Sequence, residues 1–189
     1  ACSDPELAFK QLIMEAGADI CILEPAAYPA RIPEAQHAMS MALNDWQANH
    51  WLDPRNNWHE RWRGSICLAI EEPERSVEEI ERWADHPFMS QILIKAEPRP
   101  SWGNPKYDAI WAAATKHDIP LSCHLSRSHY DELPMPPVGL PSYNHDFMVT
   151  YSLLAANKVM SLIYDGTFDR HPTLKIVFCL LYTSDAADD

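Results

Sequence analysis

The chain alternates short apolar runs with longer segments of helical periodicity, and this alternation limits its fold more than any other feature. Five apolar runs have the composition of strands: Ile20–Glu24, Ser65–Ile70, Gln91–Lys95, Pro120–Leu125 and Leu174–Cys179. The segments between them are predicted helices: Pro33 to about Trp51, Ser76–Asp85, Tyr107–His117 and Asp146 to about Asp165. Parallel strands need such crossovers, and the covering helices bury both faces of the sheet. The pattern therefore predicts an α/β fold with a parallel sheet.

Two architectures satisfy this pattern, an open doubly wound sheet and a (β/α) barrel. An open dinucleotide-binding sheet normally has a glycine-rich turn after its first strand. This chain has only 5 glycines among 189 residues, and Pro-Ala-Ala-Tyr follows Glu24. The sequence therefore favours the barrel.

The charge balance excludes some classes of partner. The chain has 27 acidic and 15 basic residues, a formal net charge of -12. This charge repels nucleic acid phosphates and anionic lipid headgroups. Every apolar run is also far shorter than the roughly 20 residues of a membrane-spanning helix. We therefore expect a small-molecule substrate, with neither nucleic acid nor membrane as a partner.

The cysteines indicate a reducing compartment. The chain has 5 of them, without a CxxC pair, and most lie inside apolar runs. An odd number in such positions is typical of buried free thiols rather than of a disulfide framework. No leader with a basic and then an apolar region is visible at the start of the sequence. We therefore predict a cytoplasmic protein.

Polar residues at the carboxyl ends of barrel strands face a common mouth, where the active sites of such barrels lie. The candidates are Glu24, Glu71, Lys95, Glu97 and His124. His124 ranks first because a neutral imidazole is a good ligand for zinc and similar metals. Considered alone, a histidine at a strand end is more often structural, and no HxH or HExxH motif supplies further ligands.

The region after the strand that ends near His124 offers weaker candidates. A proline-rich stretch, Leu133–Pro141, reads as a long, stiff loop on the same edge of the barrel. His129 and His145 flank this stretch, and we predict that they contact substrate. The tryptophans of the region 46–62 are expected to pack in the core rather than to form a substrate box.

Several segments resemble a known protein family in their residues and in their order along the chain. They are Asn44-Asp-Trp46, Arg61–Ile66, Pro73–Trp83, Asn104–Trp111, Ile119–His124, Gly139–Tyr143 and Asp165–Phe178. Together they resemble the amidohydrolase-related family of the amidohydrolase superfamily, which includes aminocarboxymuconate semialdehyde decarboxylase and related aromatic-acid decarboxylases. The likeness covers about residues 8 to 179, and its specificity comes from the ordered combination of motifs.

The resemblance implies a TIM (β/α)8 barrel that holds a divalent metal, with zinc as the first expectation and manganese as the alternative. Family members bind the metal with an HxH-type pair on the first strand, a histidine after the fifth and an aspartate after the eighth. His124 matches the fifth-strand histidine, so the run at Ile20 corresponds to strand 2 and the run at Leu174 to strand 6. We therefore expect residues 1–179 to form a partial barrel domain, and residues 180–189 to be a tail foreign to the family.

The resemblance leaves the reaction open. Members activate water for hydrolysis or decarboxylate small, often aromatic or cyclic, acids without an oxidant. Hydrolysis by metal-activated water is our first expectation and decarboxylation the second. A third reading is an inactive partial barrel whose open sheet edges favour aggregation, and a fourth is a metal-free binding barrel. The sequence does not decide the general acid or base or the oligomeric state, and a homo-oligomer stays open.

Overall fold

The computed structural model describes residues 4–25, 32–95, 100–124 and 143–179, with the side chains of 144–151 excepted. Its centre is one parallel sheet with the strands in sequence order, β1-β2-β3-β4-β5. The strands are β1 (Cys21–Ile22), β2 (Trp62–Cys67), β3 (Met89–Ile94), β4 (Leu121–Cys123) and β5 (Ile176–Phe178). The predicted parallel α/β fold is confirmed.

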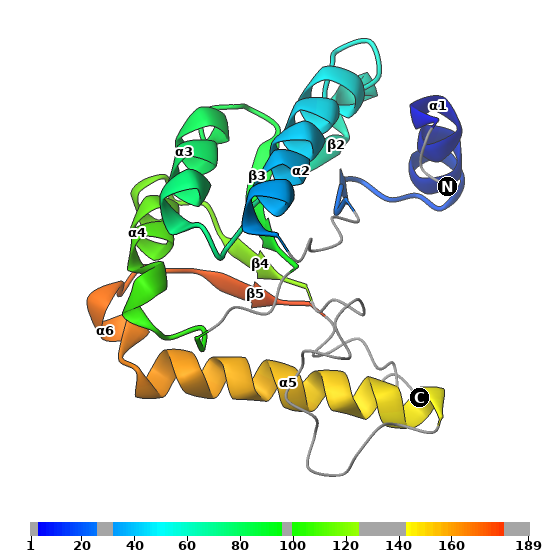
Figure 1. Ribbon diagram of the computed structural model, residues 1–189. Helices are drawn as coiled ribbons and strands as arrows, with labels where there is room; N and C mark the ends of the chain where they lie inside the picture. Colours follow the sequence, from blue (N-terminus) through cyan, green and yellow to red (C-terminus); the bar gives the residue numbers. More distant parts are fainter. Residues whose placement is uncertain (1–3, 26–31, 96–99, 125–142, 180–189) are drawn as a thin grey trace.

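Helices follow one another around the curved sheet (Figure 1). The longer ones are α2 (Pro33–Trp46), α3 (Pro73–Trp83), α4 (Asp108–Lys116) and α5 (Asn144–Tyr164). Shorter helices are α1 (Pro5–Ala8), η1 (Phe9–Glu15), η2 (Gln47–Trp51), η3 (Trp58–Glu60), η4 (Pro105–Tyr107) and α6 (Thr167–Arg170). Strands that alternate with helices around a curled sheet make a partial TIM barrel, as expected. None of the helices in the described ranges is long and apolar enough to span a membrane.

The face of the sheet toward the helices, here called the outer face, carries the core. Ile66, Ile92 and Leu121 are aligned across β2, β3 and β4 and are fully buried. They belong to one apolar cluster with side chains of the surrounding helices, such as Trp111 of α4 and Leu162 of α5. Because side chains alternate along a strand, the next residues in each strand point to the opposite, inner face.

The inner face mixes apolar side chains with polar ones, among them the paired Ser65 and Gln91. One row across it consists of Cys67, Leu93, Ser122 and Val177, each directly after a residue of the outer row. Ser122 is buried whereas Val177 is half-exposed. The inner face is therefore the side of the partial barrel where polar groups can meet a ligand.

Two side-chain amides of α2 extend the hydrogen bonding of β2. Asn44 accepts from the backbone N–H of Cys67 and donates to its carbonyl, at 2.7 and 3.0 Å. Gln47 likewise accepts from the backbone N–H of Ser65 at 3.0 Å and donates to its carbonyl at 2.8 Å. In the described part of the chain β1 pairs with β2 at Trp62 and Arg63, and the amides bind the backbone groups of β2 beyond that point.

Ser76 and Glu79 have the Ser-x-x-Glu spacing that predicts a capping box at the start of α3, but this prediction is wrong. The helix begins earlier, at Pro73, and the Ser76 hydroxyl donates to the carbonyl of Ala69 at 2.9 Å. Glu79 instead accepts from the Asn44 amide at 2.8 Å. Ala69 also accepts from the backbone N–H of Glu72, so the chain turns after Cys67 and β2 ends before the predicted Ile70.

Trp46 is 40% exposed, contrary to the prediction, whereas Trp51 and Trp62 pack in the core as predicted. Their rings meet edge to face with centroids 5.1 Å apart, and each is only 1% exposed. This packing joins η2 to the start of β2 on the outer face. It leaves no substrate box between these two rings.

Candidate active site

Three polar residues that end strands meet at the carboxyl edge of the sheet. Glu24 follows β1, Lys95 follows β3 and His124 follows β4. Lys95 and His124 come directly after the paired residues Ile94 and Cys123, and the His124 N–H donates to the Ile94 carbonyl at 3.0 Å. The parallel register therefore places these residues at neighbouring strand ends, as the barrel hypothesis predicted.

The Glu24 side chain lies across the inner face rather than in solvent. Its Oε1 accepts from Gln91 Nε2 and from Ser122 Oγ, each at 3.3 Å. Gln91 Nε2 also donates to Ser65 Oγ at 2.9 Å, and Ser65 Oγ donates to the carbonyl of Leu23 at 2.6 Å. These bonds tie four neighbouring strands into one polar network that fixes the orientation of the carboxylate.

His124 approaches the other oxygen of that carboxylate. Its Nε2 lies 3.9 Å from Glu24 Oε2, and both side chains are 29% exposed. This distance is too long for a hydrogen bond. The second ring nitrogen, Nδ1, is buried and has no hydrogen-bond partner among the described residues. The imidazole is therefore held by its backbone and its packing, with Nε2 toward the carboxylate.

Lys95 adds a cationic group to the site. Its Nζ donates to the Glu24 carbonyl at 3.1 Å. Burial lowers the pKa of Lys95, and the nearby Glu24 carboxylate partly opposes that shift. Partial desolvation also strengthens electrostatic interactions of this ammonium with an incoming anion.

Two thiols line the inner face nearby and are poor nucleophiles. Burial raises the pKa of Cys67 to about 12. Burial also raises the pKa of Cys179, whose Sγ lies 3.2 Å from Ser122 Oγ. Since the thiolate is the reactive form of cysteine, neither thiol is suited to nucleophilic catalysis at neutral pH.

The donors fit a divalent metal in type. Imidazole nitrogen and carboxylate oxygen are both ligands of zinc and of manganese. Within the ranges described by the structure, no group of three or more His, Cys, Asp or Glu side chains could hold a metal ion. His124 and Glu24 are thus two donors of suitable type, fewer than the three or four protein ligands that a zinc site requires.

The remaining predicted site residues have other positions. Glu71 lies away from this network, with Lys106 Nζ at 2.6 Å and the Tyr107 hydroxyl at 3.1 Å from its carboxylate. His145 is in the first turn of α5, where the side chains are outside the described set. Glu97, His129 and the proline-rich stretch 133–141 lie outside the described residues, as do residues 180–189.

The hydrogen-bonding partners of the Glu24 carboxylate are not among the site residues predicted from the sequence. Ser65, Gln91 and Ser122 are polar residues of β2, β3 and β4, and all three are buried on the inner face. In the sequence each of them stands next to an isoleucine or leucine of a strand, and this alternation could have indicated a polar inner position. A polar residue at such a position requires a hydrogen-bond partner, and here that partner is directly or indirectly Glu24.

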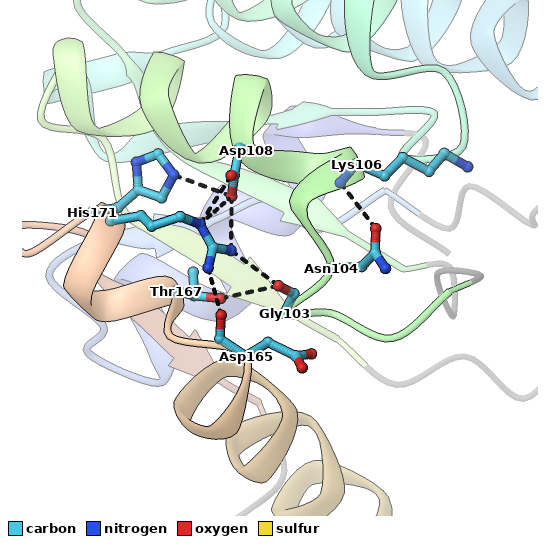
Figure 2. Close-up of polar contacts among 8 residues, drawn as sticks. Gly103, Asn104, Lys106, Asp108, Asp165, Thr167 and His171 are labelled. Carbon is cyan, nitrogen blue, oxygen red and sulfur yellow. Dashed lines mark hydrogen bonds and ion pairs between the residues drawn. The ribbon is translucent and has the colours of Figure 1, made fainter.

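A second polar cluster surrounds α6, the helix that precedes β5 (Figure 2). Arg170 forms a two-pronged ion pair with Asp108, at 2.9 and 3.0 Å, and donates to the carbonyls of Gly103 and Asp165. His171 Nε2 lies 3.3 Å from the same carboxylate. A Cβ at Gly103 would clash with the Ser161 carbonyl, so this glycine permits close contact with α5. The cluster joins α4, α5 and α6.

Comparison with known proteins now identifies the family. A family model described as Amidohydrolase matches residues 17–179, which include the sheet and the strand-end site. The chain belongs to the amidohydrolase family. A search of curated proteins found no match.

Solved structures share this fold. An amidohydrolase from Mycobacterium avium subsp. paratuberculosis is similar over 92% of this chain and 47% of its own, with 22% identity and a TM-score of 0.70. 2,6-Dihydroxybenzoate decarboxylase from Rhizobium is similar over 94% and 55%, with 20% identity and a TM-score of 0.69. 5-Carboxyvanillate decarboxylase from Novosphingobium aromaticivorans, crystallised with manganese and 4-hydroxy-3-methoxy-5-nitrobenzoic acid, is similar over 93% and 48%, with 24% identity and a TM-score of 0.69. This amidohydrolase-family chain spans about half the length of these structures.

Proposed function

We propose that this chain is part of a metal-dependent enzyme that removes a carboxyl group, as carbon dioxide, from a small aromatic or cyclic acid. The observation that carries the proposal is the meeting of His124 and Glu24 at the carboxyl edge of an amidohydrolase-family barrel, with Lys95 beside them. A bound divalent metal would supply an electrophile that polarises the substrate. His124 Nε2 would be one of its ligands.

Lys95 favours an anionic substrate in this proposal. Its ammonium group is partly buried and lies at the strand end next to His124. A carboxylate or phenolate that reached this edge would pair with the lysine more strongly than it would in bulk water. His129 and His145, on either side of the proline-rich stretch, remain our proposed contacts to the rest of the substrate.

Hydrolysis by metal-activated water is the second candidate, and it was the first expectation from sequence. Decarboxylation moves ahead because two of the structural relatives described above are named decarboxylases of aromatic acids. Manganese likewise becomes our preferred metal over zinc, because the 5-carboxyvanillate decarboxylase was crystallised with manganese. A cytoplasmic location stays a prediction from the cysteines alone.

The test is a paired assay of the purified protein loaded with Mn²⁺ or Zn²⁺. Dihydroxybenzoates and carboxyvanillate are supplied in one arm, with carbon dioxide release as the readout. Aromatic esters, amides and lactones are supplied in the other, with acid release as the readout. We expect metal-dependent carbon dioxide release that His124→Ala abolishes. Acid release alone would favour hydrolysis, and no turnover by a metal-loaded protein would favour the inactive partial barrel.

A further inference from the structure

The Glu24 carboxylate is held unequally at its two oxygens. Oε1 accepts hydrogen bonds from Gln91 and Ser122, and Cys179 Sγ lies 3.7 Å from the same atom. Oε2 makes no hydrogen bond within the described part of the chain, and it faces His124 Nε2. One oxygen is thus anchored while the other remains available to a ligand.

This arrangement differs from that of a glutamate that simply ends a strand. Such a side chain would extend into water, whereas Glu24 lies over the inner face and is bonded to β3 and β4. Ser122, one of its donors, is 98 positions away in sequence and only 1% exposed. Fixing a carboxylate in this way costs side-chain entropy and hydration, and the two hydrogen bonds offset part of that cost.

The spacing between the two facing atoms fits a shared ion better than a direct bond. At 3.9 Å, Glu24 Oε2 and His124 Nε2 are beyond hydrogen-bond reach. Two donors that bind one zinc ion at about 2.0–2.2 Å each lie roughly 3–3.5 Å apart at a tetrahedral angle. A closure of about half an ångström, within the reach of side-chain rotation, would bring both atoms onto one ion.

We propose that Glu24 Oε2 and His124 Nε2 are two direct ligands of one divalent metal ion, with Glu24 as a carboxylate ligand from β1. The inference rests on the proposed metal-dependent function and adds a residue to it. Gln91 and Ser122 act as positioning residues, because their bonds to Oε1 leave Oε2 toward the imidazole. Lys95, bonded to the Glu24 carbonyl, holds the backbone of the same residue.

The decisive variant is Glu24→Gln, which is nearly isosteric. Its amide oxygen can still accept from Gln91 and Ser122, while its NH₂ group replaces the ligand oxygen. Glu24→Asp is the second variant, since it keeps the charge but withdraws the carboxylate by one methylene. Glu81→Gln is the matched control, because it removes the same charge from α3, on the helical side of the sheet.

The experiment is a Mn²⁺ titration of the 189-residue chain, followed by loss of the free-ion electron paramagnetic resonance signal. Far-ultraviolet circular dichroism and thermal unfolding report whether each variant is folded. We expect Glu24→Gln and His124→Ala each to raise the Mn²⁺ dissociation constant at least ~10-fold. Even loss of an outer-sphere partner of a metal ligand typically weakens metal affinity by that factor. Glu81→Gln should bind as wild type does, and Glu24→Asp should fall between.

The outcomes separate this inference from the proposed function. If folded Glu24→Gln binds Mn²⁺ as tightly as wild type does while His124→Ala loses it, Glu24 is not a ligand and the metal function stands. If neither substitution changes Mn²⁺ affinity, both proposals are overturned. If Glu24→Gln does not fold, wild-type affinity in Glu24→Asp overturns the inference. Absence of Mn²⁺ binding by the wild-type chain also overturns it.

Discussion

The two faces of the sheet differ in the side chains that they carry. On the outer face Ile66, Ile92 and Leu121 form a buried row against the helices. One residue further along the same strands, the inner row contains Cys67 and Ser122, with the Glu24 network beside it. The alternation of side chains along a strand thus separates a stabilising surface from a chemical one by a single position.

The difference shows which substitutions should affect folding and which should affect function. Outer-face side chains contribute free energy through the apolar area that they remove from water. Inner-face groups such as Glu24 are partly exposed and are satisfied by hydrogen bonds, so their net contribution to stability is smaller. Substitutions on the two faces should therefore separate the free energy of unfolding from the affinity for metal.

The largest effect on stability is expected from Ile92→Ala on the outer face. Ile92 is fully buried in the apolar cluster, so truncation removes apolar burial and leaves a cavity. We expect a loss of about 2–5 kcal/mol in the free energy of unfolding, measured by urea denaturation. Val177→Ala on the half-exposed inner face is the matched control and should cost less than about 1 kcal/mol. Equal losses would contradict the division between the faces.

Asn44→Ala should have the next largest effect. The substitution leaves the backbone N–H and carbonyl of Cys67 without their side-chain partner and also removes a donor to Glu79. Buried groups left unpaired cost about 1–3 kcal/mol each, so we expect a loss of about 2–3 kcal/mol. Asn49→Ala, which removes an exposed bond to Asp45, should change stability by less than about 0.5 kcal/mol. Comparable losses for the two variants would show that the amide does not stabilise β2.

Arg170→Met tests whether the cluster before β5 is separate from the metal site. The variant removes the two-pronged pair with Asp108 and the bonds to two carbonyls, and we expect it to cost about 1–2 kcal/mol of unfolding free energy. Asp108→Asn and the double variant complete a thermodynamic cycle. Mn²⁺ affinity should stay at the wild-type value in all three folded proteins. A weaker affinity would connect this cluster to the inner face.

The smallest effect is expected from Glu81→Gln, and it should depend on pH. Hydrogen bonds from Lys116, the last residue of α4, and then the nearby His117, whose Nε2 lies 3.0 Å from the carboxylate, lower the pKa of Glu81 below its ordinary value of 4.5. A lowered pKa in the folded state means that the ionised carboxylate stabilises the fold above pH 4.5, and that this stabilisation is lost as pH falls through the folded-state pKa. Thermal unfolding should show a slightly lower midpoint for the variant at pH 7 and no difference at pH 2. A constant difference would point to packing instead of charge.

The sequence by itself determined the architecture. Apolar runs that alternate with helical segments predicted a parallel sheet covered by helices, and the strands lie in sequence order, as in a barrel. The boundaries of single elements were predicted less well, as at α3, which begins at Pro73 instead of Ser76. Ser76, for example, bonds to Ala69 instead of capping α3, because the turn after β2 offers it a buried carbonyl.

In the candidate site, too, the sequence determined one part and the tertiary structure another. Strand-end position and family resemblance selected His124, because a residue's place along its own strand is visible in the sequence. Tertiary structure decided that Glu24 faces it. That contact depends on how neighbouring strands align and on where Gln91 and Ser122 point, and these are properties of pairing between segments far apart in the chain.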